Sequence, residues 1–136
     1  MRASIRGSRH SLEDIMTQQP ATTTPLSKEM QDCVQACMTC HSVCEETMSS
    51  CLQMGGPAQM QIMRTVMDCA EMTRMCADMM MRRSPLMAEM CAMCARACDM
   101  CAEACMSMPD DAQMMRCAEA CRRCAESCRS MSAASM

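Results

Sequence analysis

The sequence has no Phe, Tyr or Trp among its 136 residues, and it has only three Ile, three Val and four Leu. An ordinary hydrophobic core is built largely from these residue types, so this chain cannot form one. Its apolar side chains are instead mainly sulfur-bearing, with 24 Met and 16 Cys. Because Met specifies packing poorly, packing alone gives no reason for so many sulfur atoms. The composition therefore indicates that the protein binds a soft ligand.

The sequence also lacks long apolar runs and an excess of basic residues. No stretch reaches the roughly eighteen consecutive apolar residues of a membrane-spanning helix, and the N-terminal segment lacks the apolar region of a secretory signal. The net charge of -3 and the pI near 5.3 provide no basic face for nucleic acid. We expect no membrane or nucleic-acid partner and a cytoplasmic location, where a high cysteine content favours metal binding over disulfides.

Helix-breaking residues are few, with three Gly and five Pro in the whole chain. Residues 1–24 have no cysteine and no apolar period, which predicts a disordered leader; Met16 is an alternative start that would make residues 1–15 an extension. Thr24 and Pro25 then predict an N-cap and a first helical turn. Later Gly, Pro and Asp residues divide the remainder into four predicted helices, at about 25–54, 57–83, 85–107 and 112–131.

The short connections between these helices determine their arrangement. Helices joined by only a few residues must be antiparallel neighbours. Ala, Met, Arg and Glu favour helix almost throughout, and β-branched runs are scarce. We therefore predict an all-α fold, in which residues 25–136 form an antiparallel up-down-up-down four-helix bundle after the disordered leader.

The cysteines follow one face of each predicted helix. They recur at spacings of three, four and seven residues, which is the a/d pattern of a bundle seam. Every cysteine is therefore expected to point toward the bundle axis. The candidate ligands are Cys33, Cys37, Cys40, Cys44, Cys51, Cys69, Cys76, Cys91, Cys94, Cys98, Cys101, Cys105, Cys117, Cys121, Cys124 and Cys128.

A purely structural role accounts less well for the cysteine pattern. Buried Cys can act as a small hydrophobe, but using it instead of Leu in nearly every layer sacrifices apolar burial worth roughly 25 cal/mol per Å². Disulfides within one helix would close loops too short to restrict the unfolded chain much. A thiol-disulfide redox protein and a zinc or iron-sulfur protein remain the alternatives to copper.

Ligand chemistry favours Cu(I) among the soft metals. Thiolate and thioether ligands select Cu(I), zinc and iron-sulfur clusters. Zinc needs four converging ligands, commonly from CxxC pairs on tight turns, whereas here CxxC lies within continuous helices. Cu(I) accepts two or three sulfurs, so thiols one helical turn apart suffice. At roughly one Cu(I) per cysteine, each ion displaces about one proton and the core stays near neutral. The pattern therefore predicts storage of multiple Cu(I) ions.

Methionines gather where the first and third helices end and the second and fourth begin; we call this the methionine end. Neutral thioethers bind Cu(I) more weakly than thiolates, so they suit an entrance, although core filling or exposure at helix ends is an equal alternative for any single Met. His41 lies beside the cysteine stripe and is a candidate flanking ligand, but a helix-interface histidine is the more ordinary interpretation. The candidate methionines are Met48, Met54, Met60, Met63, Met106, Met108, Met114 and Met115.

The segments CVQACMTCHSVC (33–44), SPLMAEMCAMCARACDMCAEAC (84–105) and CAEACRRCAESCRSM (117–131) resemble the first, third and fourth helices of bacterial copper storage proteins of the cytosolic type. The resemblance implies a non-catalytic, Cys-filled four-helix bundle that holds many Cu(I) ions and assembles as a homotetramer. Copper ions are the expected partner, with a copper chaperone or a copper-requiring enzyme as further candidates.

Two departures from the family pattern affect the expected capacity and entry route. Thr47 stands between Cys44 and Cys51 where such proteins often have Cys, and the second helix is poor in Cys. Methionines also replace the histidines that cytosolic relatives often carry before the last helix. We expect uneven capacity along the bundle and a different entry chemistry. In the second helix, the expected inward positions without sulfur are Ile62, Val66 and Thr73.

Overall fold

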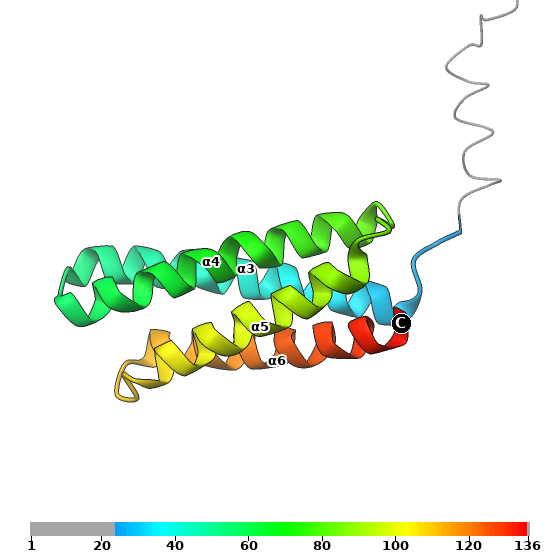
Figure 1. Cartoon of the computed structure of the whole chain (residues 1–136). Coiled ribbons are helices and arrows are strands. Elements are labelled where there is room, and N and C mark those ends of the chain that lie inside the picture. The colour runs from blue at the N-terminus through cyan, green and yellow to red at the C-terminus, as the bar shows by residue number, and fades with distance from the viewer. Residues whose placement is uncertain (1–23, 136) are drawn as a thin grey trace, which may run out of the picture.

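The computed structural model describes residues 24–135 and shows an all-α fold. The predicted leader lies outside this part of the chain, apart from Thr24. Figure 1 shows the helices following one another along the chain with short connections. Their bounds are Lys28–Met54 for α3, Pro57–Met81 for α4, Met87–Met106 for α5 and Ala112–Ser135 for α6.

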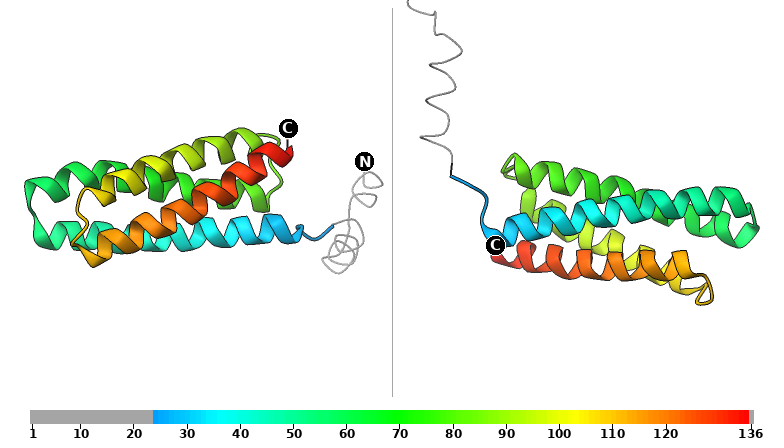
Figure 2. Two further views of the ribbon diagram at one scale, coloured as in Figure 1. Left: turned by 90° about the horizontal axis from the view of Figure 1, so that it is seen from below. Right: turned by 180° about the vertical axis from the view of Figure 1, so that it is seen from behind.

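The helices form an antiparallel up-down-up-down bundle, as the short connections predicted (Figures 1 and 2). Helix α3 packs against α4 and α6, and α5 packs against the same two helices, so the four surround a common axis. The connections 55–56 and 107–111 lie together at the methionine end. The start of α3 and the end of α6 both lie at the opposite end (Figure 2).

The start of α3 corrects one sequence prediction. The helix is capped by Ser27 and not by Thr24, because the Ser27 hydroxyl oxygen accepts a hydrogen bond of 3.2 Å from the backbone N–H of Met30. The side-chain amide of Gln31 also donates to the Leu26 carbonyl at 2.7 Å. Thr24 and Pro25 therefore precede the helix.

The turn between α3 and α4 depends on a left-handed residue. Gly55 has φ 65°, and its N–H donates to the Cys51 carbonyl at 2.9 Å, which ends α3. Glycine adopts this conformation without the steric cost that a Cβ would add. Pro57 then starts α4, because its missing N–H would be unpaired in the first turn anyway.

The remaining helix ends depart slightly from the predicted limits. Helix α4 stops at Met81, since Arg83 adopts a left-handed φ of 54°. Asp111 caps the start of α6: its Oδ1 accepts from the N–H groups of Gln113 at 2.9 Å and Met114 at 3.1 Å. Helix α6 continues past Met131 to Ser135, because no Gly or Pro follows to interrupt it.

None of the helices in the described part of the chain is long and apolar enough to cross a membrane.

Replacing the cap residue, Ser27→Ala, should lower the free energy of unfolding by about 1 kcal/mol, because the Met30 N–H loses its acceptor. Urea unfolding of the reduced, metal-free protein would measure the change. Ser49→Ala, at an exposed position inside α3, is the control and should leave stability unchanged or slightly raised. Equal stability of the two variants would contradict the assigned cap.

Candidate metal centre

The bundle core is made mainly of thiols. All sixteen cysteines are free and have 0% exposed surface, so the predicted inward orientation is confirmed. The helices achieve this because spacings of three and four residues keep successive side chains on one face. The cysteines therefore occupy the place that Leu, Ile and Phe take in most bundles.

Sulfur atoms from different helices lie in contact along the axis. The Sγ atoms of Cys37 and Cys128 are 3.7 Å apart, and Cys124 donates to Cys37 at 3.6 Å. Further along the axis, Cys69 donates to Cys98 at 3.7 Å. Contacts of this length leave the thiols close enough for one soft ion to be shared between helices without a change of backbone.

The thiols gather in four clusters, in each of which every Sγ lies within 4.8 Å of the others, and three of these clusters overlap. Neighbouring clusters share Cys40, Cys44 and Cys121, so much of the sulfur forms one connected network. Such sharing matches the bridging that several soft ions need when each thiolate contacts more than one of them. The clusters are Cys37, Cys76, Cys94, Cys128; Cys40, Cys44, Cys69, Cys121; Cys44, Cys101, Cys117, Cys121; and Cys40, Cys98, Cys124.

The remaining cysteines extend this network toward both ends. At the end opposite the methionine end, Cys33 lies 3.9 Å from Cys128 and Cys91 lies 3.7 Å from Cys76, between Sγ atoms. Toward the methionine end, the neighbouring thiols of Cys101 and Cys117 raise the pKa of Cys105. Cys51 lies one turn beyond Thr47.

Thiol–thiol hydrogen bonds divide the core cysteines into proton acceptors and donors. Bonds with Cys128, Cys37 and Cys91 lower the pKa of Cys76 to about 5. Bonds with Cys128 and Cys37 raise the pKa of Cys124, because it gives up its proton less readily while donating. Neighbouring thiols thus take the role that water would have in stabilising a thiolate.

Two buried threonines interrupt the sulfur surface. Thr47 and Thr73 are both 0% exposed, and their hydroxyls donate to backbone carbonyls one turn earlier, Thr47 to Val43 at 2.7 Å and Thr73 to Cys69 at 2.8 Å. Val66 is also fully buried and Ile62 nearly so. The predicted inward positions without sulfur are therefore confirmed, and the sulfur is unevenly distributed.

A polar layer missing from the sequence prediction covers the thiols at the methionine end. The Gln113 side chain donates to the Thr47 hydroxyl at 3.0 Å, and the nearly buried Gln59 donates to the Met54 sulfur at 3.7 Å. Burial and the charge of Asp111 raise the pKa of Cys51 at this end. The glutamines were missed because a lone Gln in a helix is typical of a solvated face.

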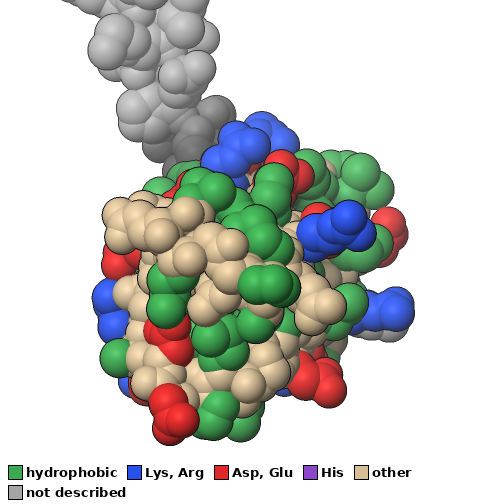
Figure 3. Space-filling view, turned by 90° about the vertical axis from the view of Figure 1, so that its left-hand side faces the viewer, with side chains coloured by type: hydrophobic (Ala, Val, Ile, Leu, Met, Phe, Trp, Pro, Cys, Tyr) green, Lys and Arg blue, Asp and Glu red, His purple; other side chains and the backbone are tan. Residues whose placement is uncertain are grey.

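The predicted entrance methionines divide into two groups. Met114 is 1% exposed, and Met48, Met63, Met108 and Met115 pack partly buried against the core. Figure 3 looks onto this end, where hydrophobic side chains gather across the middle of the face. Exposed methionines form the second group: Met54, Met60 and Met106, of which Met106 accepts from Arg122.

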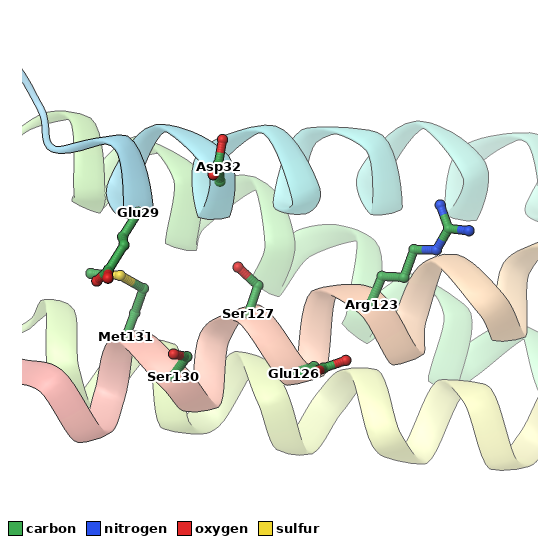
Figure 4. A pocket seen from close by; sticks show the side chains of 7 residues that line it. All are labelled: Glu29, Asp32, Arg123, Glu126, Ser127, Ser130 and Met131. Atoms are coloured by element: carbon green, nitrogen blue, oxygen red, sulfur yellow. The ribbon is translucent and has the colours of Figure 1, made fainter.

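The opposite end of the bundle also carries methionines. Met80 is 0% and Met131 7% exposed, so they close the core there. Beside them a surface groove between α3 and α6 is lined by charged and hydroxyl side chains, and Glu29 and Met131 point toward one another across it (Figure 4). Ser127 also lines this groove.

His41 lies at the α3–α4 interface. Its Nδ1 is 2.7 Å from the Ala70 carbonyl oxygen, and its Nε2 is 3.9 Å from Glu45. A hydrogen bond to a carbonyl requires a proton on Nδ1, which leaves Nε2 facing the partly exposed side of the helix. The geometry favours the helix-interface role over ligation of the axial thiols.

Comparisons with known proteins agree with this geometry. The model of the copper storage protein family, Csp, matches residues 26–133. The Cu(I)-bound copper storage protein BsCsp3 is 32% identical, with a TM-score of 0.73 over 77% of this chain and 99% of that one. Apo copper storage protein 3 from Bacillus subtilis is 33% identical, with a TM-score of 0.70 over 75% of this chain and 97% of that one.

A protein of Nitrosospira multiformis is similar to the same degree, at 33% identity and a TM-score of 0.71, covering 79% of this chain and 97% of its own. No curated protein sequence matches the chain.

The burial of the thiols predicts their reactivity. In the native, reduced, metal-free protein, a bulky thiol reagent should react only as fast as the bundle opens, because all sixteen sulfurs are shielded. In denaturant all sixteen should react at the rate of free cysteine. Spectrophotometric thiol counting over time measures both. Immediate reaction of several thiols in the native protein would contradict the closed core.

Proposed function

The chain belongs to the copper storage protein family, and we propose that it stores or sequesters several Cu(I) ions on the thiolates that line its bundle. The observation that carries this proposal is the connected thiol network. Sixteen buried sulfurs, twelve of them in clusters of three or four, offer many two- and three-sulfur sites, which suit Cu(I), and no single site dominates.

Charge balance supports storage of a monovalent ion. An empty core of sixteen thiolates would be prohibitively unstable, so the metal-free protein holds most of them as neutral thiols. Each Cu(I) that binds displaces about one proton, and bridging thiolates keep the number of ions near the number of cysteines. The core therefore remains near neutral at every stage of loading.

We propose that ions enter through the methionine end. Buried methionines lie at both ends, but the methionine end also has polar amides and a hydroxyl beside the thiols. A Cu(I) ion passing partly buried thioethers keeps soft ligands during entry. Cys51 is the α3 thiol nearest the methionine end and would be the first thiolate on that helix to receive the ion.

We place this activity in the cytoplasm, because a core of free thiols needs a reducing compartment. A binding role and not catalysis suits cysteines that a substrate cannot reach. The exposed methionines of the α4–α5 groove, Met93 and Met100, offer apolar surface for homotetramer assembly. A copper chaperone or a copper-requiring enzyme would supply or receive the ions.

Copper capacity tests the storage function. The reduced protein should take up roughly one Cu(I) per cysteine, as measured by elemental analysis after titration with a Cu(I) chelator complex. Cys98→Ser with Cys121→Ser should lower the capacity by about two ions, since two thiolates are removed and each accounts for about one ion. Met93→Leu is the control and should retain full capacity. Uptake well below about ten ions per chain would refute storage.

The rate of Cu(I) uptake tests the proposed entrance separately from the capacity. A triple variant with Leu in place of Met63, Met108 and Met114 keeps the side-chain volume but removes three thioethers. Cu(I) uptake should therefore slow, while Cu(I) capacity stays the same. The matched control replaces Met72, Met93 and Met100, which line the α4–α5 groove. Stopped-flow measurement of Cu(I) transfer distinguishes them. Equal rates for the two triple variants would contradict entry at the methionine end.

A further inference from the structure

One thiol cluster differs from the rest in its origin. Cys37 comes from α3, Cys76 from α4, Cys94 from α5 and Cys128 from α6, so each helix contributes one sulfur. We call this the four-helix cluster. The two remaining four-sulfur clusters take two cysteines from one helix, Cys40 with Cys44 or Cys117 with Cys121.

The spacing of the four-helix cluster matches a tetrahedral ion. A Zn–S distance of about 2.3 Å places tetrahedral sulfurs about 3.8 Å apart. The Sγ atoms of Cys37 and Cys128 are already 3.7 Å apart, and all pairs in the cluster lie within 4.8 Å. Side-chain movements of about 1 Å or less would therefore complete the tetrahedron.

Neighbouring thiols are placed to stabilise the charge of such a site. Four thiolates around a divalent ion carry a net charge of -2, which is costly in a dry core. Cys124 donates to Cys37 at 3.6 Å and lies 3.9 Å from Cys128. Cys33 lies 3.9 Å from Cys128 and Cys91 lies 3.7 Å from Cys76. Once the four ligands are thiolates, they can only accept, so these neighbouring thiols would donate their S–H groups to them, as the outer partners of metal ligands commonly do.

We propose that the four-helix cluster is a tetrahedral site for one Zn(II) ion in the copper-free protein. Binding replaces the four S–H protons with one divalent ion, without oxidation or reduction. The ion joins all four helices at one point and so stabilises the bundle whose core holds little hydrocarbon. It is a binding site additional to copper storage, in the same core.

The test compares Zn(II) binding in two single variants on α5. Cys94→Ser removes a ligand of the four-helix cluster, and Cys105→Ser removes a buried thiol outside that cluster. The reduced, metal-free proteins are titrated with Zn(II) against a chromophoric chelator. Wild type and Cys105→Ser should bind one ion tightly and gain thermal stability, whereas Cys94→Ser should lose affinity at least about tenfold.

Co(II) used alone as a probe reports the coordination. The chain has no aromatic residues, so thiolate-to-Co(II) absorption in the ultraviolet is unobscured. Intense visible bands of tetrahedral thiolate-bound Co(II) should appear in wild type and Cys105→Ser and weaken in Cys94→Ser. Cys76→Ser, with Cys69→Ser as its match on α4, repeats the comparison if Cys94→Ser does not fold.

The outcomes separate this site from copper storage. Absence of a tight 1:1 Zn(II) complex, or equal loss of affinity in both members of a matched pair, overturns the four-helix site. Octahedral Co(II) spectra in wild type also overturn it. Cu(I) capacity is measured on the same samples, and full copper loading with no Zn(II) binding would refute the zinc site while leaving storage intact.

Discussion

Thiols buried away from water stay uncharged unless a neighbouring thiol or a cation stabilises the thiolate, and this constraint governs the whole bundle. All sixteen sulfurs are fully shielded from water. The negative charge of a thiolate in this core can therefore be stabilised only by a neighbouring thiol or by a metal ion. Cysteine buries less hydrocarbon than Leu, so the metal-free bundle relies more than most on helix propensity, caps and short turns. Bound metal then supplies cohesion that the side chains lack.

The fold was largely predictable because its local signals agree with one another. Cysteine spacings of three and four, Gly55 and Pro57 at one turn, and the Asp111 cap all favour the same four helices. The start of α3 was misplaced because Thr24 and Ser27 are both good caps in sequence. Only the hydrogen bond from the Met30 N–H distinguishes them, and that depends on where the chain leaves the first turn.

The composition of each thiol cluster was beyond the reach of the sequence. Spacing shows which face of its helix a cysteine occupies, but the cluster it joins depends on the axial offset between neighbouring helices. That offset brings Cys37, Cys76, Cys94 and Cys128 to one level. The same limit applies to His41, whose Nδ1 finds a carbonyl on α4, and to Gln113, which reaches across to Thr47. Contacts between helices decide these roles.

The even number of helices has a consequence for how the bundle can be attached to larger assemblies. Because α3 begins and α6 ends on the same side, any polypeptide joined before α3 or after α6 emerges from the side away from Met108 and Met114 (Figure 2). A fused domain or an anchoring tail would therefore hold the bundle by the end opposite the methionine end and leave the methionine end facing outward.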